Sequence, residues 1–244
     1  MVVATASTVK TVSAYMRYLE RDCHGEGLLF RGQREDKPLL PKIARLSVRT
    51  DLLAAETEML DEFKLQALSF LQFQPVDDWD WLALAQHYGM ATRLLDWTAN
   101  PIAAFWFAVE RPAVDDGPGV VWVFDTKKTD YVSRDAKSTP FSGVRTAVFR
   151  PRHITRRIVA QSGWFTVHKY LEDQKRFIAL EKNTLYSKRM KKVTIPAASF
   201  ADIRRELDRC GFNDATLYAD LDGLCRDLNR RNPRLEDEED EADA

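Results

Sequence analysis

Cysteine is scarce in this chain of 244 residues, and its positions follow no pattern. Cys23, Cys210 and Cys225 are too few and too far apart for a disulfide framework or a zinc site. An odd number of scattered cysteines is typical of reduced thiols. We therefore expect a cytoplasmic protein without a metal cofactor.

Long apolar segments are also missing. The longest apolar run, Ile102–Val109, is far shorter than the ~20 residues that a membrane-spanning helix requires. The first ten residues lack the apolar stretch of a signal peptide. Both absences predict a protein with no membrane partner, and they agree with a cytoplasmic location.

Several nucleotide- and metal-binding motifs are absent as well. The sequence contains no Walker loop, no Rossmann glycine triplet, no His-Glu-x-x-His and no Gly-x-Ser-x-Gly. The sequence therefore contains no motif that would indicate an ordinary ATPase, a dinucleotide dehydrogenase, a zincin or an α/β-hydrolase. Glu35-Asp36-Lys37, with Asp22 upstream, fits the short Glu-x-Lys element of metal nucleases. Such a three-residue match keeps a nuclease as a third hypothesis only.

The net charge of −1 conceals an asymmetry along the chain. Residues 236–244 contain seven acids and no base, and without them the net charge of residues 1–235 is +6. The acidic tail has nothing apolar to bury, so we expect it to be disordered. No linker or repeat divides residues 1–235, which predicts a single, mildly basic domain suited to an anionic ligand.

The hydrophobic pattern predicts an α+β fold, with small mixed or antiparallel sheets flanked by helices. Helices are expected at 8–21, 51–73, 78–88, 102–110, 199–210 and 214–229. Strands are expected at 27–32, 119–125, 157–167, 176–180 and 191–196. Because helices and strands do not alternate strictly, the pattern does not favour a parallel α/β sheet.

Two motifs resemble those of the FRG family. Phe30-Arg31-Gly32-Gln33 is similar to the motif that names the family, and the thirteen residues from Gln86 to Thr98 are similar to its central motif, with Ala91 where a proline is usual. Similarity continues at Ala103–Ala108, Arg157–Phe165 and Asp220–Leu224, so it extends over nearly the whole chain. The resemblance implies one FRG-type domain over residues 1–235.

A weaker similarity links the chain to ADP-ribosyltransferases. In those enzymes an apolar strand ends in Phe/Tyr-Arg-Gly, and its arginine holds a phosphate of NAD. A Ser/Thr-bearing strand, a helix of small residues and a late strand with a catalytic glutamate follow. Thr92–Thr98, Ile102–Glu110 and the segment around Gln161 occur in the same order, although Gln161 replaces the glutamate. The similarity implies a split-sheet architecture and NAD as a substrate.

The candidate site residues divide into two groups. We expect catalytic roles for His87, Asp96 and Gln161. We expect ligand contacts from Arg31, Gly32, Gln33, Thr92, Arg93 and Thr98. Structural roles stay open for several of them, because Arg31 or Arg93 could pair with Asp96 and His87 could cap its helix.

The leading hypothesis is a nucleotide- or NAD-binding protein, either an ADP-ribosyltransferase or an NAD-cleaving enzyme, with a defence or toxin-like role. Its macromolecular target would be a protein or a nucleic acid. The alternative is a non-catalytic module that binds nucleic acid or protein through the basic surface Arg145–Arg157. The oligomeric state does not follow from the sequence.

Overall fold

The computed structural model describes residues 4–47, 51–71, 74–133, 139–152 and 159–232. The predicted acidic tail lies outside these residues. Within the described part of the chain, no helix has both the length and the apolar character needed to cross a membrane.

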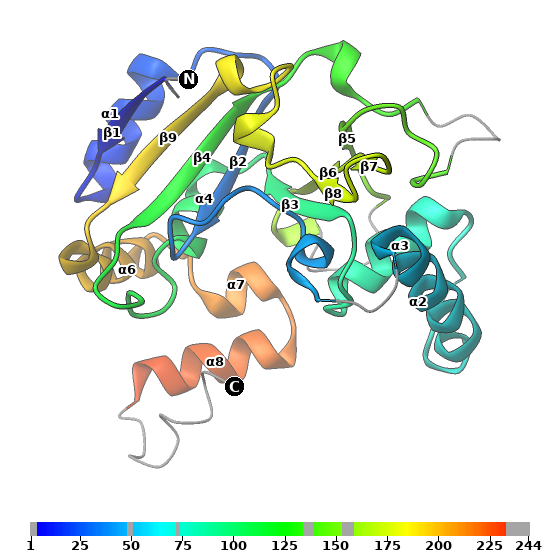
Figure 1. Cartoon of the computed structure of the whole chain (residues 1–244). Coiled ribbons are helices and arrows are strands. Elements are labelled where there is room, and N and C mark those ends of the chain that lie inside the picture. Colours follow the sequence, from blue (N-terminus) through cyan, green and yellow to red (C-terminus); the bar gives the residue numbers. More distant parts are fainter. Residues whose placement is uncertain (1–3, 48–50, 72–73, 134–138, 153–158, 233–244) are drawn as a thin grey trace.

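The fold is a mixed α+β structure, as predicted, but seven of its strands form one large sheet where small sheets were expected (Figure 1). In spatial order its strands are β1 (Ala4–Thr8), β9 (Met190–Ile195), β4 (Gly119–Asp125), β2 (Leu28–Gln33), β3 (Leu94–Thr98), β6 (Gly163–Val167) and β5 (Ala147–Phe149). β1 runs parallel to β9, and every other neighbouring pair is antiparallel. β7 (Tyr170–Leu171) and β8 (Arg176–Phe177) form a second, two-stranded sheet.

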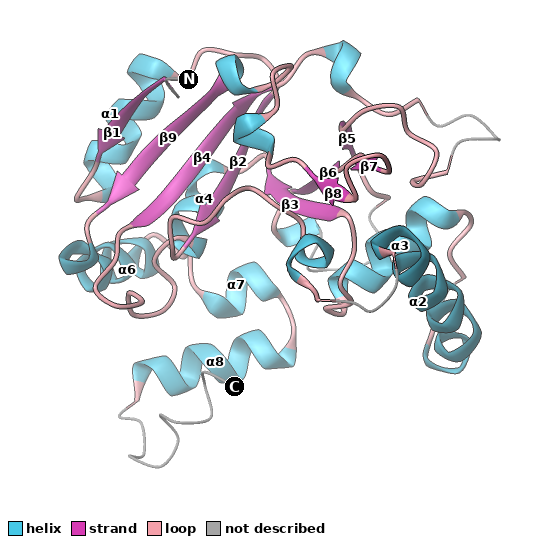
Figure 2. Ribbon diagram, in the orientation of Figure 1, coloured by secondary structure: helices cyan, strands magenta, loops and turns pink. Residues whose placement is uncertain are grey.

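The joint between β2 and β3 is the weakest connection in the large sheet. β2 pairs with β4 along its whole length, from Leu28 to Gln33. Its register with β3 consists of the single pair Phe30 and Thr98. Beyond that pair the strands diverge, so β1, β9, β4 and β2 form one group and β3, β6 and β5 another (Figure 2).

Seven α-helices surround the sheet in the described residues. They are α1 (Val12–Asp22), α2 (Leu52–Ala67), α3 (Asp78–His87), α4 (Pro101–Phe107), α6 (Phe200–Arg209), α7 (Asp214–Tyr218) and α8 (Leu221–Arg231). Short 3-10 segments occur at Lys42–Arg45, Leu68–Phe70, Lys128–Asp130, Leu180–Lys182, Ser187–Arg189 and Ala197–Ser199. α2 and α3 lie beside β3, β5 and β6, whereas α1 and α6 lie beside the β1–β9 end of the sheet (Figure 1).

Helix α4 packs against β2 at the centre of the fold. The Asn100 side chain accepts hydrogen bonds from the backbone N–H groups of Ile102 and Ala103, and Pro101 opens the helix, as the sequence predicts. Gly32 lies directly beneath α4, where a Cβ atom would be 1.9 Å from the carbonyl oxygen of Ala104. Only glycine therefore permits this close contact between strand and helix.

Most predicted elements are present, but several boundaries are wrong. The helix expected from Thr8 begins at Val12, because Thr11 caps it and the preceding residues form the unpredicted strand β1. The helix expected at 214–229 is two helices, since Ala219 adopts a left-handed conformation (φ 52°) between α7 and α8.

The expected strand 157–167 begins only at Gly163, and its first two residues lie outside the described ones. Gln161 consequently lies in a turn just before β6 and not on a strand. The next residue, Ser162, has a positive φ of 47°. The turn directs the chain into β6, which pairs with β3. In this register Asp96 lies opposite Phe165, and Thr98 lies opposite Gly163.

Candidate functional site

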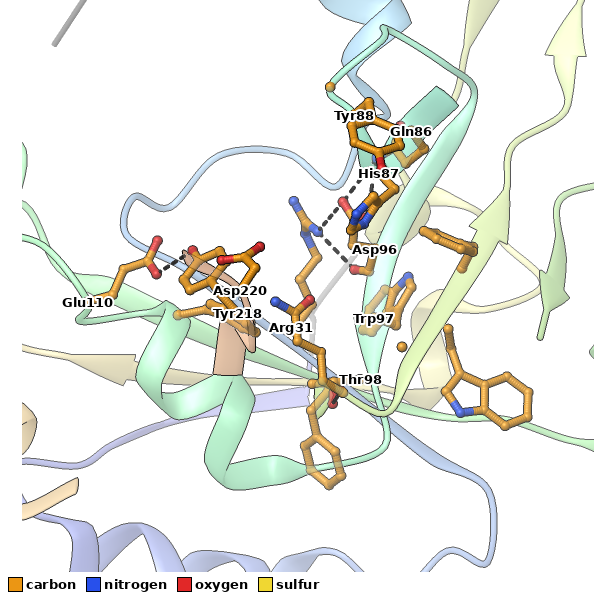
Figure 3. A pocket seen from close by; sticks show the side chains of 18 of the residues that line it. Arg31, Gln86, His87, Tyr88, Asp96, Trp97, Thr98, Glu110, Tyr218 and Asp220 are labelled. Carbon is orange, nitrogen blue, oxygen red and sulfur yellow. Dashed lines mark hydrogen bonds and ion pairs between the residues drawn. The ribbon is translucent and has the colours of Figure 1, made fainter. Parts of the chain in front are cut away.

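A pocket of about 620 Å³ opens where β2 and β3 diverge. Its lining combines aromatic side chains with charged and amide groups (Figure 3). Residues from β2, the end of α3, β3, the Gln161 turn, β6 and the α7–α8 connection contribute to it. The structure brings Arg31, His87, Asp96 and Gln161 together here, although they are far apart in the sequence.

Arg31 bridges the gap between the two strands. Its Nη1 donates a hydrogen bond to the Asp96 carbonyl oxygen at 2.8 Å and lies 3.5 Å from Asp96 Oδ2. Burial lowers the pKa of the Arg31 guanidinium, and the Asp96 carboxylate acts in the opposite direction. Arg31 Nε is buried and has no acceptor among the described residues. The guanidinium is therefore fixed at one edge while part of its donor capacity is unused.

The Asp96 carboxylate is held from a second side by α3. Gln86 Nε2 donates to its two oxygens at 3.3 and 3.1 Å. The Gln86 side-chain oxygen accepts a hydrogen bond of 2.7 Å from the Thr92 hydroxyl. Thr92 therefore orients Gln86, and Gln86 with Arg31 orients Asp96, whose side chain keeps 56% of its surface exposed.

His87, Thr98 and Gln161 also line the pocket. His87 is the last residue of α3, and its ring meets that of Tyr88 edge to face at 4.9 Å. The Thr98 hydroxyl donates to the Gln161 carbonyl oxygen and accepts from the backbone N–H of Asn100. Its hydrogen-bonding capacity is therefore used within the protein. Gln161 Nε2 is buried without an acceptor among the described residues.

Arg93 was predicted to contact a ligand, but it does not line the pocket. Its Nε and its backbone N–H donate to the Glu56 carboxylate at 2.8 and 2.6 Å, and the guanidinium lies 4.6 Å from the Phe141 ring. The Arg93 and Glu56 side chains are only 2% and 0% exposed. Arg93 is therefore directed into the core and pairs with Glu56, not with Asp96.

Two further predicted contacts lie outside the pocket lining. Thr92 is fully buried and acts through Gln86, as described above. Gln33 donates weakly to the Lys37 carbonyl oxygen at 3.4 Å. Gly32 does line the pocket, but its contact with α4 already accounts for the glycine.

The wall formed by Glu110, Tyr218, Asp220 and Asp222 was not predicted as part of the site. The Tyr218 hydroxyl donates to Glu110 Oε2 at 2.9 Å. Burial raises the pKa of the Glu110 carboxyl, and Asp214 raises it further. The available sequence signals were a carboxylate at the end of the apolar segment 102–110 and an Asp at a helix start, and neither indicates a pocket by itself.

The basic stretch Arg145–Arg157 is occupied by its own chain wherever it is described. Arg145 donates to the Thr129 carbonyl oxygen, Arg150 lies 5.2 Å from the Trp164 ring, and Arg152 pairs with Asp80 at 3.3 Å. Arg156 and Arg157 lie outside the described residues. These contacts give no support to the alternative hypothesis that this surface binds nucleic acid or protein.

The Glu35–Lys37 segment gives the nuclease hypothesis no support from its contacts. Lys37 pairs with Glu35 at 2.8 Å, and Asp36 pairs with Lys192. In the part of the chain that the structure describes, no group of three or more His, Cys, Asp or Glu residues is placed to hold a metal ion.

Comparison with known proteins finds a similarity to a family model. No curated protein and no solved structure matches the chain. Residues 26–117 match the model of the FRG domain. This region contains Arg31, His87, Asp96 and Glu110, while Gln161 and Tyr218 complete the pocket from outside it. Residues 26–117 are therefore similar to the FRG domain.

Proposed function

We propose that the pocket binds a phosphate-bearing nucleotide, NAD or a related ADP-ribosyl compound. The proposal is carried by two buried donors, Arg31 Nε and Gln161 Nε2, which lack acceptors among the described residues and belong to residues of the same pocket. Buried donors without acceptors are costly, and phosphate oxygens are acceptors only. A planar guanidinium is well suited to binding phosphate.

The remaining lining supports a nucleotide over inorganic phosphate. A volume of about 620 Å³ lies within the range typical of small-molecule sites. Phe107 and Trp164, which are partly buried, contribute aromatic surface on which a base or a nicotinamide ring can stack. The Trp164 ring also contacts the Arg150 guanidinium and the Tyr131 ring.

With NAD bound, this pocket would support cleavage of the bond between the ribose C1′ and the nicotinamide nitrogen. Nicotinamide leaves with the bonding electrons, positive charge develops on the ribose, and water or a target nucleophile attacks C1′. Asp96, held by Arg31 and Gln86, would stabilise that charge. His87 would take the proton of the nucleophile, and Gln161, which is neutral, would hydrogen-bond a ribose hydroxyl.

Calorimetric titration of NAD, ADP-ribose and nicotinamide into Arg31→Lys tests the binding. We expect NAD and ADP-ribose affinity to fall about 10- to 100-fold, because a lysine cannot present the guanidinium fork. The matched control is Arg204→Lys, since Arg204 also donates to a backbone carbonyl, that of Val109, but does not line the pocket. Unchanged affinity in Arg31→Lys, or a wild-type protein that binds neither nucleotide, would refute the proposal.

Nicotinamide release by the wild-type protein, Asp96→Asn and Gln161→Glu tests the chemistry. We expect Asp96→Asn to slow release by ~100- to 1,000-fold, the usual effect of removing one stabiliser of a charged transition state. Gln161→Glu should leave the rate unchanged or raise it, because it adds a second carboxylate. Full activity in Asp96→Asn would remove Asp96 from the reaction and leave ligand binding as the function.

A further inference from the structure

The two sides of the pocket differ in charge. Figure 3 shows Glu110, Tyr218 and Asp220 on one side of Arg31, and Asp96, His87 and Gln86 on the other. Among the described residues that line the pocket, Arg31 is the only Lys or Arg, and the wall beyond it carries Glu110, Asp220 and Asp222. A ligand whose phosphate lies at Arg31 must therefore present a different kind of group to this wall.

Glu110 is the least exposed carboxylate of that wall. Its Oε2 accepts the Tyr218 hydroxyl at 2.9 Å, and no hydrogen bond to Oε1 is formed within the described residues. Burial removes water from its carboxylate and thereby raises the pKa of the carboxyl. The charges of Arg111 and Arg226 lower this pKa, and that of Asp214 raises it. Hydroxyl donors from a ligand would offset the cost of burial.

We propose that Glu110 is a specificity-determining residue that admits a ribose with free hydroxyls and rejects one that carries a second phosphate. This inference rests on the proposed function, which places the first phosphate at Arg31. A carboxylate accepts hydrogen bonds from a ribose diol, but it repels a phosphate dianion strongly in a partly desolvated site. The favoured substrate class is a nucleotide phosphorylated only at its 5′ position.

Glu110→Gln isolates the charge, because the glutamine oxygen still accepts the Tyr218 hydroxyl. The test measures the dissociation constants of 5′-AMP, adenosine 2′,5′-bisphosphate and adenosine 3′,5′-bisphosphate for the wild-type protein and for Glu110→Gln. The wild-type protein should prefer 5′-AMP by about tenfold or more. Glu110→Gln should reduce this preference to about twofold or less. Glu58→Gln is the matched control, since Glu58 is exposed on α2 and does not line the pocket.

Tyr218→Phe provides a second variant that keeps the Glu110 charge but removes the hydroxyl that orients it. It should weaken 5′-AMP binding a few-fold and keep the discrimination against both bisphosphates. An equal preference in the wild type and Glu110→Gln would overturn the inference while leaving the proposed function intact. A wild-type protein that binds none of the adenosine phosphates, NAD or ADP-ribose would overturn both.

Discussion

Two arginine–carboxylate pairs lie close to each other along β3 but differ in almost every physical respect. Arg93 and Glu56 are 2% and 0% exposed and meet at 2.8 Å. Arg31 and Asp96 are 19% and 56% exposed, and their closest charged atoms are 3.5 Å apart. The first pair is closed to solvent, whereas the second lines the pocket.

The difference shows which charge in the central motif is available for function. Glu56 binds both the side chain and the backbone N–H of Arg93, so the two charges are paired inside the core, although Arg93 Nη2 is buried without an acceptor among the described residues. Arg31 uses one nitrogen for Asp96 and leaves buried Nε without an acceptor in the described chain. We infer that the Arg93–Glu56 pair stabilises the fold and that the Arg31–Asp96 pair serves the ligand.

Glu56→Gln should produce the largest change in stability. It leaves the buried Arg93 guanidinium without a counter-charge, which typically costs about 3–5 kcal/mol of unfolding free energy. Urea denaturation of the variant and the wild-type protein measures this difference. A loss below about 1 kcal/mol would show that the two pairs do not differ in the way that their burial indicates.

The sequence predicted the fold class and the segments that form the pocket better than the roles of individual charges. Arg93 and Asp96 both lie in an apolar stretch, and strand alternation separates their side chains but does not identify which side is the core. That assignment depends on Glu56, which is 37 residues from Arg93. A contact between a helix and a distant strand is a tertiary feature that local patterns do not contain.

Glu110 was overlooked for a similar reason. The segment 102–110 is apolar nearly all round, and this pattern predicted the buried helix α4, although the helix ends at Phe107 and does not include Glu110. The charge at its end acquires a role only through Tyr218, which is 108 residues away. The break at Ala219, which separates α7 from α8 and places Asp220 at the pocket, was hidden because its left-handed backbone occurs at a non-glycine residue.

His168 responds to the electrostatic field of both pairs. Its ring is buried, and its pKa is lowered from 6.5 to about 3, mainly by burial and further by Arg31 and Arg93. Because the unfolded chain binds a proton below pH 6.5 and the folded chain does not, stability falls as the pH drops from 6.5 toward 3. We expect a loss of about 2 kcal/mol between pH 7 and pH 5 from this group.

His168→Gln tests that contribution, because a glutamine oxygen can still accept the hydrogen bond that His168 Nε2 shares with the Thr166 hydroxyl. The variant should be less stable at pH 7, but its stability should depend less on pH between 7 and 5. Urea denaturation at both pH values gives the two slopes. Parallel slopes in the variant and the wild-type protein would mean that His168 is protonated in the folded state.

Asp96→Asn should have the smallest effect on stability and the most informative effect on binding. The Asp96 carboxylate is more than half exposed, so its pairing with Arg31 contributes at most about 1 kcal/mol to folding. The same carboxylate lies beside the guanidinium to which we assign the phosphate, and it repels an anion there. Its neutralisation should therefore raise ADP-ribose affinity a few-fold, even as it slows nicotinamide release. Titration of ADP-ribose into Asp96→Asn, with Glu58→Gln as the control for overall charge, separates the two effects. Weaker binding in Asp96→Asn would mean that the carboxylate mainly positions Arg31, in which case the Arg31–Asp96 pair would resemble the Arg93–Glu56 pair more closely than its exposure suggests.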